Sequence, residues 1–275
     1  MTTTTAPETR YLDRPDGRIA YEERGAGPLV LLVPGMGELR ASYRFLAPLL
    51  AEAGYRVVST DLRGHGDSGT TFTSYGDVAT ASDVAALVEA LGGPAVVVGN
   101  SLAAGAAVIA ATDHPDLVAG LVLLGPFVRN PTVRRSAALL FRAMTVPLWI
   151  AAAWRAYMPS LYAGRPPVDF DAYRRAVHAA LRRPGYAEAF SRTARETDHA
   201  PAEARLDAVT APVLVVMGAR DPDFPDPTAE AHWIGERLHA PVVVVPEAGH
   251  YPQAQRPDLT GAAVLDFLAT VRPRG

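Results

Sequence analysis

A serine flanked by small residues lies between a β-rich run and an alanine-rich helical stretch, in the segment Gly99-Asn100-Ser101-Leu102-Ala103. A strand-to-helix turn tight enough to expose a serine hydroxyl needs small side chains two positions before and two positions after the serine. Gly99 and Ala103 occupy those positions. The segment therefore predicts Ser101 as a nucleophile, and the alternative at this point is a serine that only caps the helix.

A serine nucleophile needs a base, because a free hydroxyl is weakly nucleophilic at neutral pH. His250 follows the last strong β-rich run, and the loops at the carboxyl ends of parallel strands meet at one edge of a sheet. The imidazole in turn needs a carboxylate that fixes its tautomer. The loop after the preceding β-rich run offers Asp221, Asp223 and Asp226. Asp221 is nearest to the strand end and is the predicted acid, with the other two as alternatives.

The oxyanion that forms during acyl transfer needs backbone N–H donors held in place beforehand. The N–H of Leu102 follows the predicted nucleophile at the start of a helix, where the helix dipole also favours negative charge. The turn Pro34-Gly35-Met36-Gly37 follows the first buried run, and the N–H of Met36 is predicted as the second donor. These glycines also fit an ordinary turn.

The elements that would position these groups are read from six apolar, β-rich runs separated by helical stretches. They span residues 29–33, 56–60, 95–98, 120–124, 213–216 and 242–245. Such alternation predicts βαβ units, with helices on both faces of a mostly parallel sheet. Asp16-Gly17 lies within residues 11–24 and indicates a hairpin that adds antiparallel strands at one edge, for eight strands in all.

The alternation is interrupted once, between residues 127 and 205, where helical patterns and prolines replace strand runs. We expect a helical insertion after the sixth strand, a core formed by residues 11–126 and 206–275, and a disordered tail over residues 1–10. Within the insertion, Trp149, Trp154 and Tyr157 are predicted to bind an apolar part of a substrate. The apolar stretch from 137 to 154 is too short and too interrupted to suggest a membrane span.

Composition excludes several classes of site. The chain has 275 residues and a formal charge of −3, which does not favour a nucleic-acid surface. It has no cysteine and, on direct reading, no lysine, so disulfides, thiolate chemistry and a lysine Schiff base are excluded. The first residues lack a secretory pattern, and we expect a cytoplasmic protein that uses no metal or organic cofactor and acts on a small molecule. A homodimer is left open.

Together these motifs resemble the α/β-hydrolase family, in its serine-nucleophile branch with a helical cap. The resemblance covers nearly the whole chain and also rests on Asp61-Leu62-Arg63-Gly64-His65-Gly66-Asp67-Ser68, Gly218-x-x-Asp221 and Gly249-His250. It implies that the insertion is a cap, or lid, over the active site. A serine at position 101 separates the chain from the branches that use aspartate there.

The expected function is hydrolysis of a small to medium, largely apolar carboxylic ester or lactone through an acyl-enzyme, of carboxylesterase or lactonase type. The alternatives are a carbon–carbon bond hydrolase or a biosynthetic acyl-transfer or thioesterase-type enzyme on the same triad. A third hypothesis is a ligand-binding module without catalysis.

Overall fold

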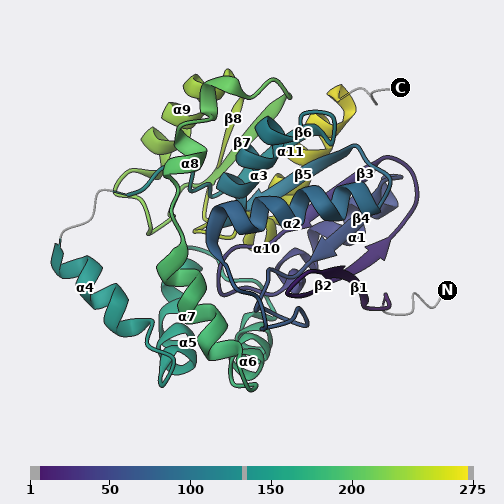
Figure 1. The fold of residues 1–275 in the computed structure, drawn as a ribbon. Helices are drawn as coiled ribbons and strands as arrows, with labels where there is room; N and C mark the ends of the chain where they lie inside the picture. The colour runs from purple at the N-terminus through teal and green to yellow at the C-terminus, as the bar shows by residue number, and fades with distance from the viewer. Residues whose placement is uncertain (1–6, 132–134, 272–275) are drawn as a thin grey trace.

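The computed structural model describes residues 7–131 and 135–271 and contains the predicted eight-stranded sheet (Figure 1). The spatial order of the strands is β1-β2-β4-β3-β5-β6-β7-β8. β1 and β2 form the antiparallel edge, β2 pairs antiparallel with β4, and the other neighbours pair in parallel. The bounds are Arg10–Arg14 (β1), Gly17–Arg24 (β2), Leu29–Val33 (β3), Arg56–Thr60 (β4), Ala95–Asn100 (β5), Val118–Leu124 (β6), Val213–Gly218 (β7) and Val242–Val245 (β8).

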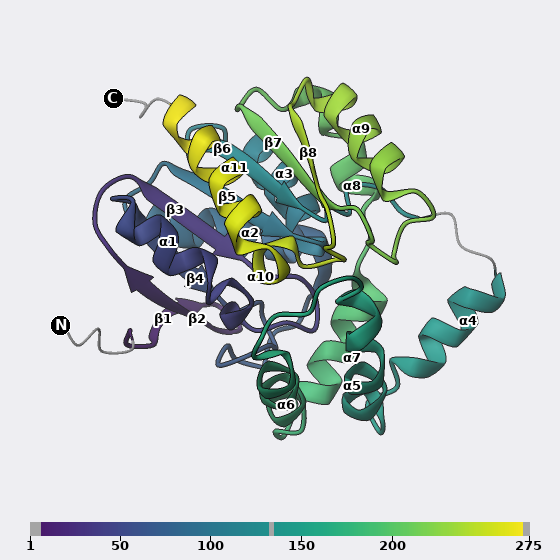
Figure 2. The same cartoon turned by 180° about the vertical axis from the view of Figure 1, so that it is seen from behind.

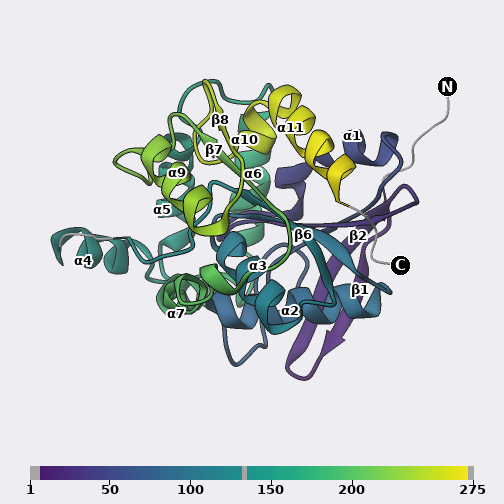
Figure 3. The same ribbon diagram turned by 90° about the horizontal axis from the view of Figure 1, so that it is seen from above.

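Helices cover both faces of this sheet, as the alternation predicted (Figures 2 and 3). α1 and α11 pack on one face, and α2, α3 and α9 pack on the other. Every residue of β3, β5 and β7 is buried, because helices exclude water from both sides of these strands. The bounds are Arg40–Tyr43 (η1), Leu46–Glu52 (α1), Gly76–Ala90 (α2), Leu102–Asp113 (α3), Leu206–Ala208 (η2), Pro227–Leu238 (α9), Pro252–Gln255 (α10) and Pro257–Thr270 (α11).

Between β6 and β7 the described chain is helical. These elements, called the inserted helices below, are Arg135–Met144 (α4), Ile150–Leu161 (α5), Phe170–Leu181 (α6), Tyr186–Glu196 (α7) and Ala200–Glu203 (α8). α5, α6 and α7 pack together around an apolar cluster that includes Trp154 and Phe190. α4 extends away from them in Figures 1 and 2, and its Leu139 and Leu140 are exposed. None of the helices within the described ranges combines the length and the apolar character that a bilayer crossing requires.

The N-terminal prediction needs one correction. Residues 1–6 of the predicted tail lie outside the described residues, but Arg10 already begins β1, where it pairs with Tyr21. The hydroxyl of Thr9 accepts a hydrogen bond from Arg40 at 2.8 Å. The ordered chain therefore begins before residue 11, because a strand pairing and an arginine far away in the sequence hold it.

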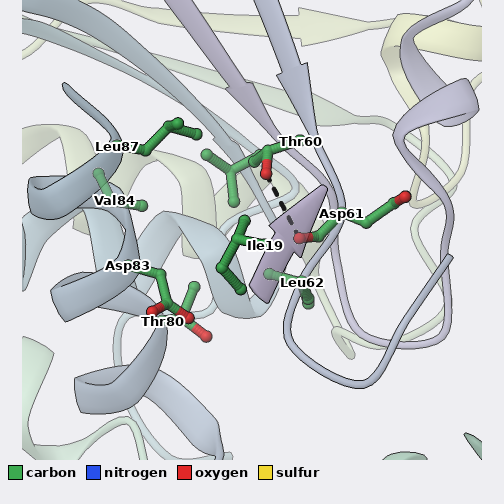
Figure 4. Close-up of a pocket in the computed structure, with 9 residues that line it drawn as sticks. Ile19, Thr60, Asp61, Leu62, Thr80, Asp83, Val84 and Leu87 are labelled. Atoms are coloured by element: carbon green, nitrogen blue, oxygen red, sulfur yellow. Dashed lines mark hydrogen bonds between the residues drawn. The ribbon is translucent and has the colours of Figure 1, made fainter. Parts of the chain in front are cut away.

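A cavity of about 10 Å³ lies beside β4 and α2 (Figure 4), which is close to the space that one water molecule needs. Ile19, Leu62 and Leu87 contribute its apolar lining. The side chain of Asp61 points away from these residues in Figure 4, and its carboxylate instead pairs with Arg40. The cavity therefore belongs to core packing and is separate from the predicted nucleophile.

Candidate active site

The backbone at Ser101 is strained. β5 ends at Asn100 and α3 begins at Leu102, so Ser101 alone makes the turn between them, with φ 59° and ψ −125°. A positive φ is unfavourable for a residue with a side chain and persists only where the surroundings enforce it. A Cβ on Gly99 would collide with the backbone of Ala103. The turn is thus closed too tightly for a larger residue at position 99, as the sequence predicted for a nucleophile elbow.

His250 and Asp221 lie in hydrogen-bond contact. Nδ1 of His250 is 2.7 Å from Oδ2 of Asp221, and both residues are only 2% exposed. Asp221 follows β7 and His250 follows β8, so adjacent parallel strands deliver the two loops to one edge. Gly125, at the end of β6, lets both side chains approach the sheet, because a Cβ there would lie 3.2 Å from Nδ1 and 3.3 Å from Oδ2.

The electrostatics of His250 are dominated by carboxylates. Burial alone would lower its pKa, but the charge and hydrogen bond of Asp221, together with the charges of Asp223 and Glu38, raise the pKa of His250 to about 9. The proton therefore stays on the imidazole well above the ordinary range of histidine. Such an imidazole binds a proton strongly, and it can act as a base only in the fraction of molecules in which it is neutral, a fraction that grows as the pH rises.

The two alternative acids have different surroundings. Oδ2 of Asp223 lies 3.7 Å from Nδ1 of His250, which is too long for a hydrogen bond but within ion-pair range. Asp226 instead caps α9 by accepting the backbone N–H of Ala229 at 2.9 Å. Of the three predicted candidates, Asp221 is the one hydrogen-bonded to the imidazole.

Asn100, the residue before Ser101, connects the serine turn to the loop that carries His250. Its Nδ2 donates to the carbonyl of Leu124 at 2.9 Å and to the carbonyl of His250 at 3.2 Å. The Ser101 hydroxyl itself makes no hydrogen bond within the described chain. Catalytic hydrogen bonds are often long before substrate binds, so the lack of a hydrogen bond at this hydroxyl is compatible with Ser101 as the nucleophile. Asn100 was not singled out in the sequence, although its position next to the serine was a usable signal.

The two predicted oxyanion donors also lie beside this turn. A Cβ on Gly35 would approach Cβ of Ser101 to 2.8 Å, so the turn that carries Met36 packs directly against the serine. In the described part of the chain, neither the N–H of Met36 nor that of Leu102 donates a hydrogen bond to another backbone group in a turn or loop. Two unengaged backbone donors thus flank Ser101, where an oxyanion hole would need them.

Trp154 and Tyr157 connect the inserted helices to the loops of this site, whereas Trp149 does not. The indole N–H of Trp154 donates to the carbonyl of Gly37 at 2.9 Å, and the hydroxyl of Tyr157 donates to Oδ1 of Asp223 at 2.8 Å. Trp149 is 47% exposed, and its indole N–H donates to the carbonyl of Ala143 in α4. The three residues predicted to bind substrate therefore divide into two beside the site and one away from it.

A buried glutamate also lies at this site and was not expected from the sequence. Glu38 is fully buried two residues after Met36, and Oε2 accepts hydrogen bonds from Tyr173 at 2.6 Å and from Tyr162 at 3.4 Å. Burial raises the pKa of Glu38 to about 7, against the opposing effect of the Tyr173 hydrogen bond. Nothing local in the sequence indicates this, because Tyr162 directly follows α5 and Tyr173 lies on α6, both far from Glu38 in the sequence.

Asp221, Asp223 and His250 also form the one set of potential metal-ligand atoms in the described ranges that lie within 4.8 Å of one another. Nδ1 of His250 is engaged by Asp221, so a cation bound there would displace the proton that orients the imidazole. The geometry fits carboxylates that orient the imidazole and stabilise its charge better than it fits metal ligation.

Comparison with known proteins gives one family. The model of the alpha/beta hydrolase family matches residues 30–263, which is most of the chain. The chain belongs to the alpha/beta hydrolase family. The serine turn, the acid after β7 and the histidine after β8 are all contained in the matched region.

Relatives of this alpha/beta hydrolase act on varied substrates. It is 32% identical to a 2-(acetamidomethylene)succinate hydrolase of Mesorhizobium japonicum, over 92% of each chain. Among solved structures, a probable hydrolytic enzyme of Pseudomonas aeruginosa superimposes with a TM-score of 0.83 at 24% identity, covering 96% of this chain and 95% of the other. A thermophilic esterase of Thermogutta terrifontis gives a TM-score of 0.77 at 25% identity, covering 96% and 99%.

Proposed function

We propose that this alpha/beta hydrolase cleaves a small to medium, largely apolar carboxylic ester or lactone through an acyl-enzyme. The observation that carries the proposal is the strained turn at Ser101, because a positive φ on a serine between a strand and a helix has no role in ordinary helix capping. The buried pair of His250 and Asp221 at the same edge supplies a base and its orienting acid.

In the proposed mechanism, Ser101 Oγ attacks the acyl carbon and its proton passes to Nε2 of His250. Asp221 accepts the Nδ1–H hydrogen bond throughout and stabilises the imidazolium that forms. The N–H groups of Leu102 and Met36 donate to the oxyanion. His250 then protonates the departing alkoxide. A water molecule, deprotonated by His250, attacks the acyl-serine, and His250 returns that proton to Ser101 Oγ as its bond to the acyl carbon breaks.

The preference for an apolar and uncharged acyl group follows from the surroundings of His250. Phe127 lies edge-on to His250 with ring centroids 5.8 Å apart and also contacts Phe224. The carboxylates of Asp221, Asp223 and Glu38 all act on the imidazole. Negative potential of this kind disfavours an anionic substrate close to the serine.

The test is covalent labelling with a fluorophosphonate, followed by intact mass and peptide mapping, and then turnover of a panel of neutral esters, lactones, thioesters and 1,3-dicarbonyls. We expect labelling at Ser101 and its loss in Ser101→Ala. Turnover of neutral esters or lactones should fall by at least about 1,000-fold in that variant, because removing a catalytic nucleophile costs several orders of magnitude in rate. Ser82→Ala, an exposed serine on α2, is the matched control and should leave labelling unchanged.

Two results would redirect the proposal. Turnover confined to the 1,3-dicarbonyls or thioesters would move it to carbon–carbon bond cleavage or acyl transfer on the same residues. A folded Ser101→Ala protein with full esterase activity would overturn the nucleophile assignment altogether.

A further inference from the structure

A second carboxylate lies beside the imidazole and is connected to the inserted helices. Oδ2 of Asp223 is 3.7 Å from Nδ1 of His250, while Oδ1 accepts a hydrogen bond from the hydroxyl of Tyr157 at 2.8 Å. The backbone N–H of Asp223 donates to Oδ1 of Asp221 at 3.1 Å. The two aspartates and the histidine thus form one connected group. α5 reaches it through the side chain of Tyr157 and through the carbonyl of Leu161, which accepts the backbone N–H of His250 at 2.8 Å.

We propose that Asp223 is a positioning residue that strengthens His250 as a proton acceptor, and that Tyr157 keeps Asp223 in the ionised, inward-facing state this requires. The inference rests on the proposed function for its catalytic meaning, since it concerns the base of that triad. It assigns Tyr157 a role in holding the acid loop, rather than the substrate contact expected from the sequence.

The placement of Asp223 is costly for a carboxylate without a partner. Its side chain is only 20% exposed, and the pKa of Asp223 is raised by burial and by the charge of Asp221, while the charge of His250 and the hydrogen bond from Tyr157 oppose that rise. A buried carboxylate that gained nothing from its neighbours would take up a proton instead. The arrangement is therefore mutually dependent: a protonated His250 favours an ionised Asp223, and the reverse.

The charge of Asp223 acts on the step in which His250 takes the proton of Ser101. When Ser101 Oγ bonds to the acyl carbon, its proton moves to Nε2, and the imidazole gains one positive charge between Nε2 and Nδ1. Asp221 meets that charge through a hydrogen bond, and Asp223 meets it through space from 3.7 Å. Asp223 takes no proton in the step, so its contribution is to the proton affinity of the base.

The other groups that act on His250 are known from the elements packed against it. Glu38 comes from the loop after β3 and Asp221 from the loop after β7, and Tyr251, next in the chain, contacts the imidazole with ring centroids 5.0 Å apart. Tyr157 acts through Asp223. Glu38, Asp221 and Tyr251 are unchanged in the Asp223 and Tyr157 variants compared below, so a shift in the pKa of His250 in those variants reports on Asp223.

The experiment follows the protonation of His250 directly, by NMR of the imidazole nitrogens in protein labelled with ¹⁵N-histidine, and in parallel the pH dependence of fluorophosphonate labelling. We expect the labelling rate to rise with pH as His250 loses its proton. In Asp223→Asn the midpoint of the pH dependence should fall by about one to three pH units. This is the range expected for removing a charge at this distance, between the dielectric constant of water and the effective value near a protein surface. Tyr157→Phe should shift it in the same direction by less, and should add nothing in the Asp223→Asn background.

Asp226→Asn is the matched control, because it removes a carboxylate from the same loop that faces α9 instead of His250, and its midpoint should equal that of the wild type. Unchanged midpoints in both Asp223→Asn and Tyr157→Phe would overturn the proposal. A loss of fluorophosphonate labelling in Asp223→Asn as complete as the loss in Asp221→Asn would also overturn it. If wild-type Ser101 is not labelled, the proposed function fails, while the NMR titration still decides the role of Asp223. Tyr157→Phe keeps the test available if Asp223→Asn does not fold.

Discussion

Replacing Glu38 by glutamine should stabilise the protein, and increasingly so as the pH rises. The carboxyl is fully buried, and its pKa is raised to about 7 from an ordinary value of 4.5. Between these two values the unfolded chain has released the proton while the folded chain still holds it, so the free energy of unfolding falls as the pH rises. Above about pH 7 the folded protein carries the full cost of a buried charge.

The size of the effect follows from that interval. Each pH unit corresponds to about 1.4 kcal/mol, so the penalty relative to a neutral side chain reaches about 3 kcal/mol above pH 7 and vanishes below pH 4.5. Glutamine keeps an oxygen that can accept the hydroxyl protons of Tyr173 and Tyr162. For a chain of this length the gain corresponds to an increase in melting temperature of about 6 °C.

The assay is thermal unfolding of the wild type and Glu38→Gln from pH 4.5 to pH 8.5, followed by circular dichroism. Glu89→Gln, on the exposed side of α2, removes the same charge and is the control. The reasoning is refuted if the difference in melting temperature between wild type and Glu38→Gln is the same at both ends of the range. It is equally refuted if Glu38→Gln is the less stable protein at pH 8.5.

Three further substitutions test the contacts around the serine turn. Gly37→Ala should lower kcat/KM at least about 100-fold, because Gly37 has φ +76° and an added Cβ would collide with the Trp154 indole. Steady-state kinetics of the folded variant tests this, and an unchanged kcat/KM would contradict it. Trp154→Phe should cost about 1 kcal/mol in urea unfolding through the lost hydrogen bond to Gly37, and an unchanged midpoint would show that the bond contributes nothing. Asn100→Leu should lower kcat about 10-fold with little change in KM, because it releases the carbonyl of His250, and a purely higher KM would contradict this.

The sheet was predictable because its strands carry their own signal. The runs at 29–33, 56–60 and 242–245 match β3, β4 and β8 residue for residue. β3 and β8 are unbroken apolar segments, and β4 carries two valines and a threonine between Arg56 and its end. β5 extends two residues beyond its predicted run, to Asn100, where a polar side chain is hydrogen-bonded inside the protein. Burial of that kind depends on the partner strands and leaves no trace in local hydropathy.

The candidate site was predictable where function requires a residue type at a strand end, and not where it depends on distant contacts. The turn at Ser101 and the approach of Asp221 to His250 follow from strand order alone. The burial of Glu38 depends on Tyr173, which is 135 residues away, and the link from Asp223 to Tyr157 spans 66 residues. Neither pairing has a sequence period or motif that would announce it.

Two side-chain hydrogen bonds from α5 to the core have a consequence for protein engineering. Trp154 contacts the glycine turn beside the serine, and Tyr157 contacts the loop that carries the acid. A chimaera that exchanged residues 127–205 for those of another family member, in order to transplant its substrate range, would also replace both connections. Substrate range and turnover rate would then change together, unless a tryptophan and a tyrosine were kept three residues apart on the grafted helix.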